Sequence, residues 1–384
     1  MSIPPPPFPF DVPLDVLRRR ASAKWRVFDD DVLPLWVAEM DAHPSDEVLA
    51  AVAHAMTTGD TGYAVASPYI DALRGFAEDR WSWRIAPEQA LLVPDVMQGA
   101  MEALGTVTGP GDAVVVTPPV YPPFFGFLHH HRRRIVEAPL DGDLRLDLDG
   151  LERAFADATA EGPAALLLCN PQNPTGTVHT REELAAVAEL AARFAVQVVA
   201  DEIHAPLVLP GADFVPYLTV PGGDRGIALQ SASKGWNLAG LKAAIAVFGD
   251  EVADRRAQIP EVVTHGASHL GTIAHTAAFR DARGWLDAAI AMIVDNRTRF
   301  AEALAAQVPD ARYRPGAATY LAWVDLREAG FGDDPATLLR EKARLAVNPG
   351  LDFGTGGTGH VRVNLATAPA IVDDAVARIA SIQL

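Results

Sequence analysis

The 384-residue sequence contains a single cysteine, Cys169, so it can form no disulfide bond within the chain and no metal site built from cysteines. This scarcity is typical of proteins in a reducing compartment. The sequence also lacks an apolar run of the roughly 18 residues that a membrane-spanning helix needs. Its N-terminus, MSIPPPPFPF, lacks the basic and apolar stretches of a secretory signal peptide. We therefore expect a soluble, cytoplasmic protein.

Basic residues are outnumbered, with 32 Lys and Arg against 49 Asp and Glu, which gives a formal net charge of −17. A surface this acidic argues against nucleic acid or an anionic membrane as the main partner. The hydrophobic fraction of 49% and the charged fraction of 21% are ordinary for a folded protein. The length allows two or three domains. The Pro4–Pro7 run cannot be helical, and we expect it to form an extended arm.

Short apolar runs alternate with helical patterns along the middle of the chain. The runs that read as buried strands are Asp112–Thr117, Ala164–Cys169, Val196–Ala200, Gly226–Gln230 and Ala243–Phe248. Continuous apolarity without alternation is typical of strands that helices cover on both faces. The segment Arg181–Phe194 has an apolar helical face, and Thr180 with Glu183 forms a capping-box pattern before it. The sequence therefore predicts an α/β fold with a mostly parallel sheet and flanking helices.

In such a sheet, ligands bind beyond the carboxyl ends of the strands. The segments that follow the first four strands contain an aromatic ring, an amide, a carboxylate and a Ser/Lys cluster: Tyr121, Asn173, Asp201 and Ser231 with Lys234. A lysine amine can form a Schiff base with a carbonyl group. A carboxylate can keep a pyridine nitrogen protonated, and pyridoxal phosphate (PLP) catalysis needs both groups.

The motifs SASKGWNLAGLK, VVADEIH, NPQNPTG and TPPVYPPF together resemble PLP-dependent enzymes of fold type I, in the class I/II aminotransferase superfamily. The segments LPLWVAEMDA, DEIH and GHVRVNLA are similar to those of cystathionine β-lyases of the MalY/PatB type, which are carbon–sulfur lyases. The resemblance runs from about Leu14 to the C-terminus. It implies the PLP-dependent transferase fold, with a large domain and a smaller α+β domain.

The resemblance also implies the role of individual residues. It implies that Lys234 holds PLP as a Schiff base and that Asp201 pairs with the pyridine nitrogen. Asn173 would bond the ring oxygen, and Tyr121 would stack on the ring. It assigns the phosphate to Ser231, Lys242, the backbone of Val96 and Met97, and the partner subunit's Tyr63. It assigns the substrate to Arg362, which would clamp the α-carboxylate, with Trp36, Asn173 and Tyr63 beside it. His204 either tunes Asp201 or only packs against it. The expected catalytic residues are Lys234, Asp201 and Tyr121.

One departure from the family concerns Asp95, which stands where relatives usually have glycine at the turn that cradles the phosphate. Its side chain would cap the following helix and lie near an anionic group. Two other features have ordinary explanations. Three consecutive histidines, His129–His131, point in different directions on regular structure, so we expect a helix end and no metal site. Trp81 and Trp83 are expected to be buried between helices.

The expected activity is α,β-elimination of cystathionine or another cysteine S-conjugate to a thiol, pyruvate and ammonia. Three alternatives stay open, because the same groups serve several reactions: an aminotransferase, a specialised S-conjugate enzyme of secondary metabolism, and a PLP-holding regulatory protein. The resemblance further implies a homodimer with shared active sites. It divides the chain into residues 1–43, an N-terminal arm with part of the small domain, residues 44–271, the large PLP-binding domain, and residues 272–384, the rest of the small domain.

Overall fold

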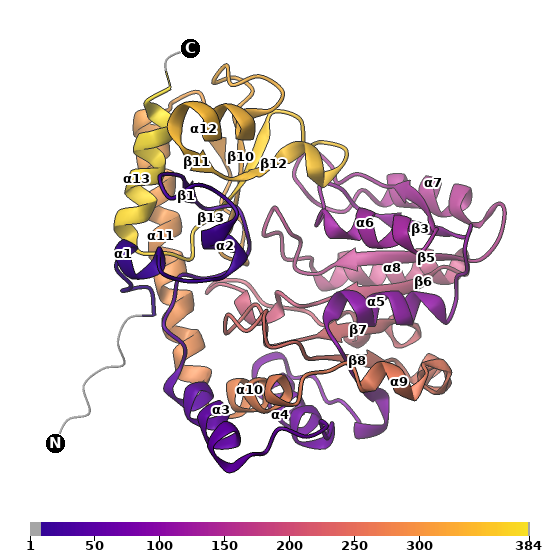
Figure 1. The fold of residues 1–384 in the computed structure, drawn as a ribbon. Coiled ribbons are helices and arrows are strands. Elements are labelled where there is room, and N and C mark those ends of the chain that lie inside the picture. The colour runs from indigo at the N-terminus through magenta and orange to yellow at the C-terminus, as the bar shows by residue number, and fades with distance from the viewer. Residues whose placement is uncertain (1–8, 383–384) are drawn as a thin grey trace.

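The computed structural model describes residues 9–382, and the Pro4–Pro7 run lies outside them. Figure 1 shows a large sheet with helices on both faces beside a smaller group of strands and helices that contains both ends of the described chain. None of the described helices is long and apolar enough to cross a membrane.

The large sheet has seven strands in the order β2-β8-β7-β6-β5-β3-β4. Their bounds are β2 Ala90–Val93, β3 Ala113–Val116, β4 Arg134–Glu137, β5 Ala164–Cys169, β6 Gln197–Asp201, β7 Ile227–Gln230 and β8 Ala244–Phe248. Strands β3 to β7 run parallel, and β8 pairs antiparallel with β7 and β2. The five predicted strands and the mostly parallel sheet are confirmed. Strands β2 and β4 were not predicted.

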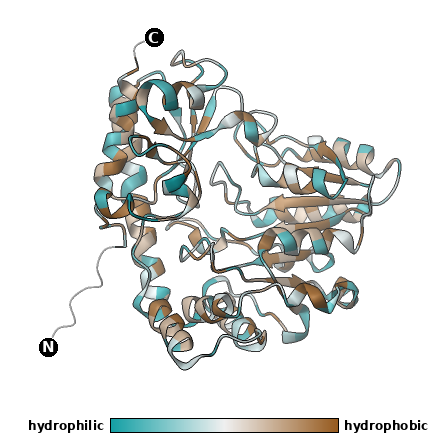
Figure 2. Cartoon of the chain, viewed as in Figure 1, coloured by the Kyte–Doolittle hydropathy of each residue, from teal (hydrophilic) through white to brown (hydrophobic). Residues whose placement is uncertain are grey.

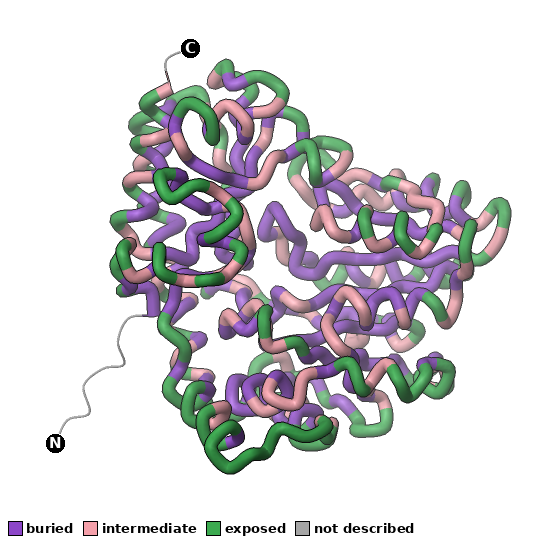
Figure 3. Tube along the Cα trace, viewed as in Figure 1, coloured by how far each residue is buried: buried purple, intermediate pink, exposed green. Residues whose placement is uncertain are grey.

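Alternation along the strands divides the apolar residues between the two faces of the sheet. Val114 and Val116 pack in one core cluster with Phe124, whereas the intervening Val115 packs in another with Phe155. This is the expected result of successive side chains pointing to opposite faces. Helices α5 (Val96–Gly105) and α6 (Pro123–His130) cover the first face, and α7 (Leu148–Thr159) and α8 (Arg181–Arg193) cover the second. Figures 2 and 3 show these strands as hydrophobic and buried.

The predicted capping box is present at α8. The Thr180 side chain accepts a hydrogen bond from the Glu183 backbone, and the Glu183 carboxylate accepts one from the Thr180 backbone. Helices α3 (Asp46–Thr58), α4 (Ser67–Trp81) and α10 (His269–Arg280) pack together beside the β8 side of the sheet, with the short α9 (Glu261–Thr264) nearby. Trp83 is buried as predicted, whereas Trp81 is only partly buried, because it packs edge-on against Phe76 at the border of the core.

The smaller part contains a four-stranded antiparallel sheet in the order β12-β13-β10-β9 and a parallel pair, β1 with β11. The strand bounds are β1 Leu33–Pro34, β9 Arg312–Tyr313, β10 Leu321–Asp325, β11 Leu345–Ala346, β12 Asn348–Pro349 and β13 His360–Asn364. The helices are α1 Leu14–Leu17, α2 Ala23–Arg26, α11 Arg283–Gln307, α12 Pro335–Ala343 and α13 Pro369–Ala380.

The β1–β11 pair joins the N-terminal segment to the C-terminal third of the chain, as the predicted domain division requires. All strands of the large sheet lie within residues 44–271, and all strands of the smaller sheets lie outside that range. Helix α10 crosses the expected boundary after Gly271 and packs against α3 and α4. The precise boundaries therefore stay a prediction.

Candidate active site

A cavity of about 270 Å³ lies at the carboxyl ends of the parallel strands. Its lining brings together eight of the residues proposed from the sequence: Val96, Met97, Tyr121, Asn173, Asp201, His204, Lys234 and Lys242. Asp95, Cys169 and Ser233 also line it. The sequence analysis gave no role to Cys169, which ends β5, or to Ser233, which lies next to Lys234.

Lys234 is a partly buried lysine that lines the cavity. Its Nζ donates a hydrogen bond to the carbonyl oxygen of Ala38 at 2.8 Å. Loss of solvation and the charge of Arg362 together lower the pKa of Lys234 to about 8, against the opposing charges of the Asp201 and Glu39 carboxylates. A lysine with this pKa carries a substantial neutral, nucleophilic fraction near neutral pH.

Asp201 is the last residue of β6 and is buried in the same cavity. Burial raises the pKa of its carboxyl group to about 6, while the hydrogen bond from the Ile203 backbone N–H, at 3.1 Å, and the charge of Lys234 lower it. The neighbouring Glu202 points elsewhere, because its carboxylate accepts from Asn170 Nδ2, Tyr217 N and Gln230 Nε2. Of these two adjacent carboxylates, only Asp201 lines the cavity.

Arg362, on β13 of the smaller sheet, is buried and does not itself line the cavity, but it contacts the lining residue Asn173. Its Nη1 donates to Asn173 Oδ1 at 3.0 Å, and its Nη2 donates to Trp36 O at 3.1 Å. The guanidinium also lies over the Phe353 ring, 5.2 Å from its centroid. Burial lowers the pKa of Arg362 to about 10, and its Nε has no hydrogen-bond partner among the described residues. A buried cation with an unpaired N–H is a suitable receptor for a carboxylate.

The rest of the lining is mainly neutral. Burial raises the pKa of Tyr121 and lowers that of His204 well below its usual value, so both side chains are uncharged near neutral pH. The Tyr121 ring meets that of Phe124 edge-on, with centroids 5.8 Å apart. His204 Nδ1 lacks a hydrogen-bond partner within residues 9–382.

The cavity lining also includes the N-terminus of α5. Asp95 is the N-cap residue, as expected, and its Oδ1 accepts from Gln98 N at 2.8 Å. Lys242 Nζ lies 2.6 Å from the other carboxylate oxygen, Oδ2. Ser231, expected at the phosphate, directs its hydroxyl to Ala243 O at 2.8 Å and to Ser233 Oγ at 3.1 Å. Its role toward phosphate stays a prediction.

A segment that precedes α3, residues 36–42, crosses the site and is held from both parts of the fold. The carbonyl oxygens of Val37 and Glu39 accept hydrogen bonds from Asn364 Nδ2, each at 2.7 Å. Met40 exchanges two hydrogen bonds with the Asn237 side chain. Since Asn237 lies three residues after Lys234 and Asn364 lies two after Arg362, the segment links the two sides of the site.

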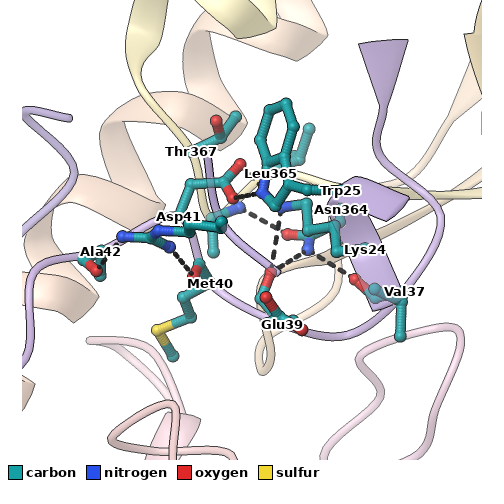
Figure 4. Close-up of polar contacts among 12 residues, drawn as sticks. Lys24, Trp25, Val37, Glu39, Met40, Asp41, Ala42, Asn364, Leu365 and Thr367 are labelled. Atoms are coloured by element: carbon teal, nitrogen blue, oxygen red, sulfur yellow. Dashed lines mark hydrogen bonds and ion pairs between the residues drawn. The ribbon is translucent and has the colours of Figure 1, made fainter. Parts of the chain in front are cut away.

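A fully buried ion pair fixes the end of this segment. Lys24 Nζ lies 2.7 Å from Asp41 Oδ2, and neither side chain has exposed surface. Trp25 Nε1 donates to the other oxygen of Asp41 at 2.9 Å, and Lys24 Nζ also donates to Glu39 O. Figure 4 shows these side chains converging on the backbone between Val37 and Ala42. No sequence motif indicated this cluster.

Two further expectations concern residues outside the cavity. Tyr63 is 87% exposed and packs only loosely on the His265 ring, so it does not contribute to the cavity of its own chain. Its expected contact with a second subunit stays a prediction. Helix α6 ends at His130 within the histidine tract, and the described part of the chain holds no cluster of three metal-ligating side chains.

The residue types around the cavity fit PLP. A lysine of lowered pKa, a buried carboxylate, an amide and an aromatic ring line the cavity together with the N-terminus of α5 and Lys242. The unpaired N–H of Arg362, which is bonded to the cavity residue Asn173, suits the carboxylate of an amino acid. These groups are the donors and acceptors that a pyridine ring, a phosphate and an amino acid require.

Comparison with known proteins gives concordant matches. The family model for aminotransferase class I and II matches residues 31–379. A putative cystathionine beta-lyase of Mycobacterium leprae is 48% identical over 95% of this chain and 96% of its own. The cystathionine beta-lyase of Corynebacterium glutamicum is 36% identical over 96% and 98%. The crystal structure of a putative PLP-dependent beta-cystathionase from Corynebacterium diphtheriae superposes with a TM-score of 0.90 at 33% identity, over 97% and 98% of the two chains.

Proposed function

The chain belongs to the aminotransferase class I and II family, and within it we propose a PLP-dependent carbon–sulfur β-lyase that acts on cystathionine or related cysteine S-conjugates. The observation that carries the proposal is the meeting of Lys234, Asp201 and Asn173 in one cavity, with Arg362 bonded to that asparagine. Bound PLP supplies an electron sink that stabilises negative charge at the substrate Cα.

Lys234 is proposed to anchor PLP through its amine and, once displaced by the amino group of the substrate, to remove the Cα proton. The lowered pKa supports this role, because an amine with a pKa of about 8 is available as a base near neutral pH. Asp201 is proposed to face the pyridine nitrogen. Burial raises the pKa of Asp201, and the charge of Lys234 opposes this shift. The Asp201 carboxyl group could therefore share a proton with the pyridine nitrogen.

Arg362 is proposed to bind the substrate α-carboxylate and so to fix the orientation of the Cα–H and Cβ–S bonds. The first bond breaks when Lys234 takes the proton, and the second when the thiolate leaves with its electron pair. The thiolate then takes a proton from Lys234 or from the neutral phenol of Tyr121. Water hydrolyses the released enamine product to pyruvate and ammonia.

The proposed enzyme is a homodimer in a reducing, cytoplasmic environment. Several large apolar side chains near α3 and α9 are exposed in the single chain: Leu49, Met56, Tyr63, Val65 and Val262. Such a surface favours contact with a second copy. The buried, unpaired Cys169 suits a reducing compartment. If Tyr63 serves the neighbouring site, inactive Tyr63→Phe and Lys234→Ala subunits regain activity when mixed. No recovery would exclude the shared site.

The activity is tested by mixing holoenzyme with cystathionine or S-alkyl cysteines in the absence of any keto acid. We expect equal release of pyruvate and free thiol from the wild type and none from Lys234→Ala, which loses the anchoring amine. Absence of thiol with conversion of the cofactor to its pyridoxamine form would instead identify an aminotransferase.

A further inference from the structure

Asp95 and Lys242 close one end of the cavity with an ion pair. The Asp95 carboxylate is bound on both oxygens, by the backbone N–H of Gln98 at 2.8 Å and by Lys242 Nζ at 2.6 Å. The Asp95 side chain is 29% exposed and that of Lys242 is 61% exposed, so the pair borders the open part of the cavity. The lining contains a second lysine, Lys234, which hydrogen-bonds Ala38 O.

The same end of the cavity offers the donors that a phosphate group needs. Val96 and Met97 are the first two residues of the ten-residue helix α5, and helix geometry leaves their N–H groups without an intrahelical acceptor. These N–H groups and the lysine form an anion-binding end. A carboxylate already occupies part of it, because Asp95 caps the helix and holds Lys242.

Bound phosphate and Asp95 therefore compete for the same cation. A phosphate monoester carries about −1.5 to −2 charges at neutral pH. Beside Asp95 it meets a like charge, and it obtains Lys242 only if the lysine leaves or shares the carboxylate. At a partly exposed position, like charges a few ångströms apart weaken binding measurably.

We propose that Asp95 sets the affinity for the cofactor by competing with its phosphate for Lys242. The carboxylate keeps Lys242 in place while the site lacks a phosphate, and it makes the phosphate contact weaker than the helix and the lysine alone would allow. This inference rests on the proposed function, since it takes PLP as the cofactor.

The test compares Asp95→Asn with the wild type in cofactor-free protein. Asparagine keeps the size and the oxygen that caps α5 but removes the charge. Equilibrium dialysis gives the dissociation constants of PLP and of pyridoxal, which lacks the phosphate. We expect Asp95→Asn to bind PLP about tenfold more tightly, a factor in keeping with loss of one like charge near a partly exposed anion, and to bind pyridoxal unchanged.

Two further variants serve as a control for Asp95→Asn and as a test of the role of Lys242. Asp334→Asn is the matched control, because Asp334 caps α12 through a hydrogen bond from Thr337 N, away from the cavity. It should leave both affinities unchanged. Lys242→Met should weaken PLP binding less in the wild type than in the Asp95→Asn background, since only in the wild type must Lys242 leave or share a carboxylate to reach the phosphate.

Inorganic phosphate provides a readout that needs neither catalysis nor PLP. At equal phosphate concentration, the melting temperature of cofactor-free Asp95→Asn should rise more than that of the wild type. Equal or weaker PLP and phosphate binding by Asp95→Asn would overturn the inference about Asp95 and leave the proposed function intact. Failure of the wild type itself to bind PLP would overturn both.

Discussion

The Lys24–Asp41 ion pair lies away from the cavity lining, yet it fixes the end of the segment that crosses the site. Changing Lys24 to Met leaves the Asp41 carboxylate buried with only the Trp25 N–H as a partner among the described side chains. Removing one member of a buried pair costs about 3–5 kcal/mol, because the remaining charge is uncompensated. We therefore expect Lys24→Met to lower the free energy of unfolding by that amount.

The double variant Lys24→Met, Asp41→Asn shows whether the loss of stability comes from the unpaired charge or from altered packing. Neither charge remains unpaired in it, and asparagine keeps an oxygen for the Trp25 N–H, so most of the loss should be recovered. The matched control is Arg84→Met. Its pair with Glu78 is exposed on both sides, and such pairs contribute at most about 1 kcal/mol.

Equilibrium unfolding in urea measures all three variants, and steady-state kinetics add a functional readout. Because Trp36 O holds Arg362 Nη2, loosening of the segment should raise KM for the substrate more than it lowers kcat. The reasoning is refuted if Lys24→Met unfolds no more easily than Arg84→Met, or if the double variant is as unstable as Lys24→Met.

Three further predictions concern the cavity itself. The rate at which cofactor-free protein captures PLP should rise with pH through about 8 and level off above it. Burial lowers the pKa of Lys234 from 10.5 to about 8, and only the neutral amine reacts. Stopped-flow absorbance measures this rate, and a rate independent of pH would contradict the prediction. Arg362→Lys should raise KM by roughly tenfold or more and leave the PLP affinity unchanged. A lysine cannot reproduce the planar guanidinium that contacts Asn173, Asn348 and Trp36. An unchanged KM would argue that Arg362 does not bind the substrate carboxylate. Asp201→Asn should still capture PLP through Lys234 but lose about 100-fold or more in kcat. It lacks the carboxylate that is proposed to keep the pyridine ring of PLP protonated. Near-normal turnover would argue that Asp201 has no such role.

Five strands of the large sheet were predictable because they are apolar at most positions. Ala164–Cys169, for example, is buried throughout, and only a strand covered on both faces needs such a run. The edge strand β4 was missed because Arg134–Glu137 is half polar and only partly buried. Strand β2 is a four-residue apolar run, Ala90–Val93, that the sequence analysis did not identify as a strand.

Tyr121, Asn173, Asp201 and Lys234 were predictable together because each lies at or just after the end of a predicted strand of the same sheet. Val96, Met97, His204 and Lys242 were assigned only by the family resemblance. The contacts of residues 36–42 were not predictable, because they join parts of the chain that are far apart in sequence. Asn364 binds Val37 and Glu39 across more than 320 positions, and Asn237 binds Met40 across 197. Local patterns do not report such pairs, and only the fold places them together.

The central claim is that the chain eliminates thiol from Cβ and does not transfer nitrogen to a keto acid. The most direct measurement counts the pyruvate and thiol formed per subunit when holoenzyme meets excess cystathionine without a keto acid. A lyase should form equal amounts of both, far above one per subunit, because elimination returns the cofactor to its starting form, with Lys234 as the proposed anchor, after each turnover. A reaction that stops at or below one turnover per subunit, with no thiol and the cofactor left in its pyridoxamine form, would contradict it.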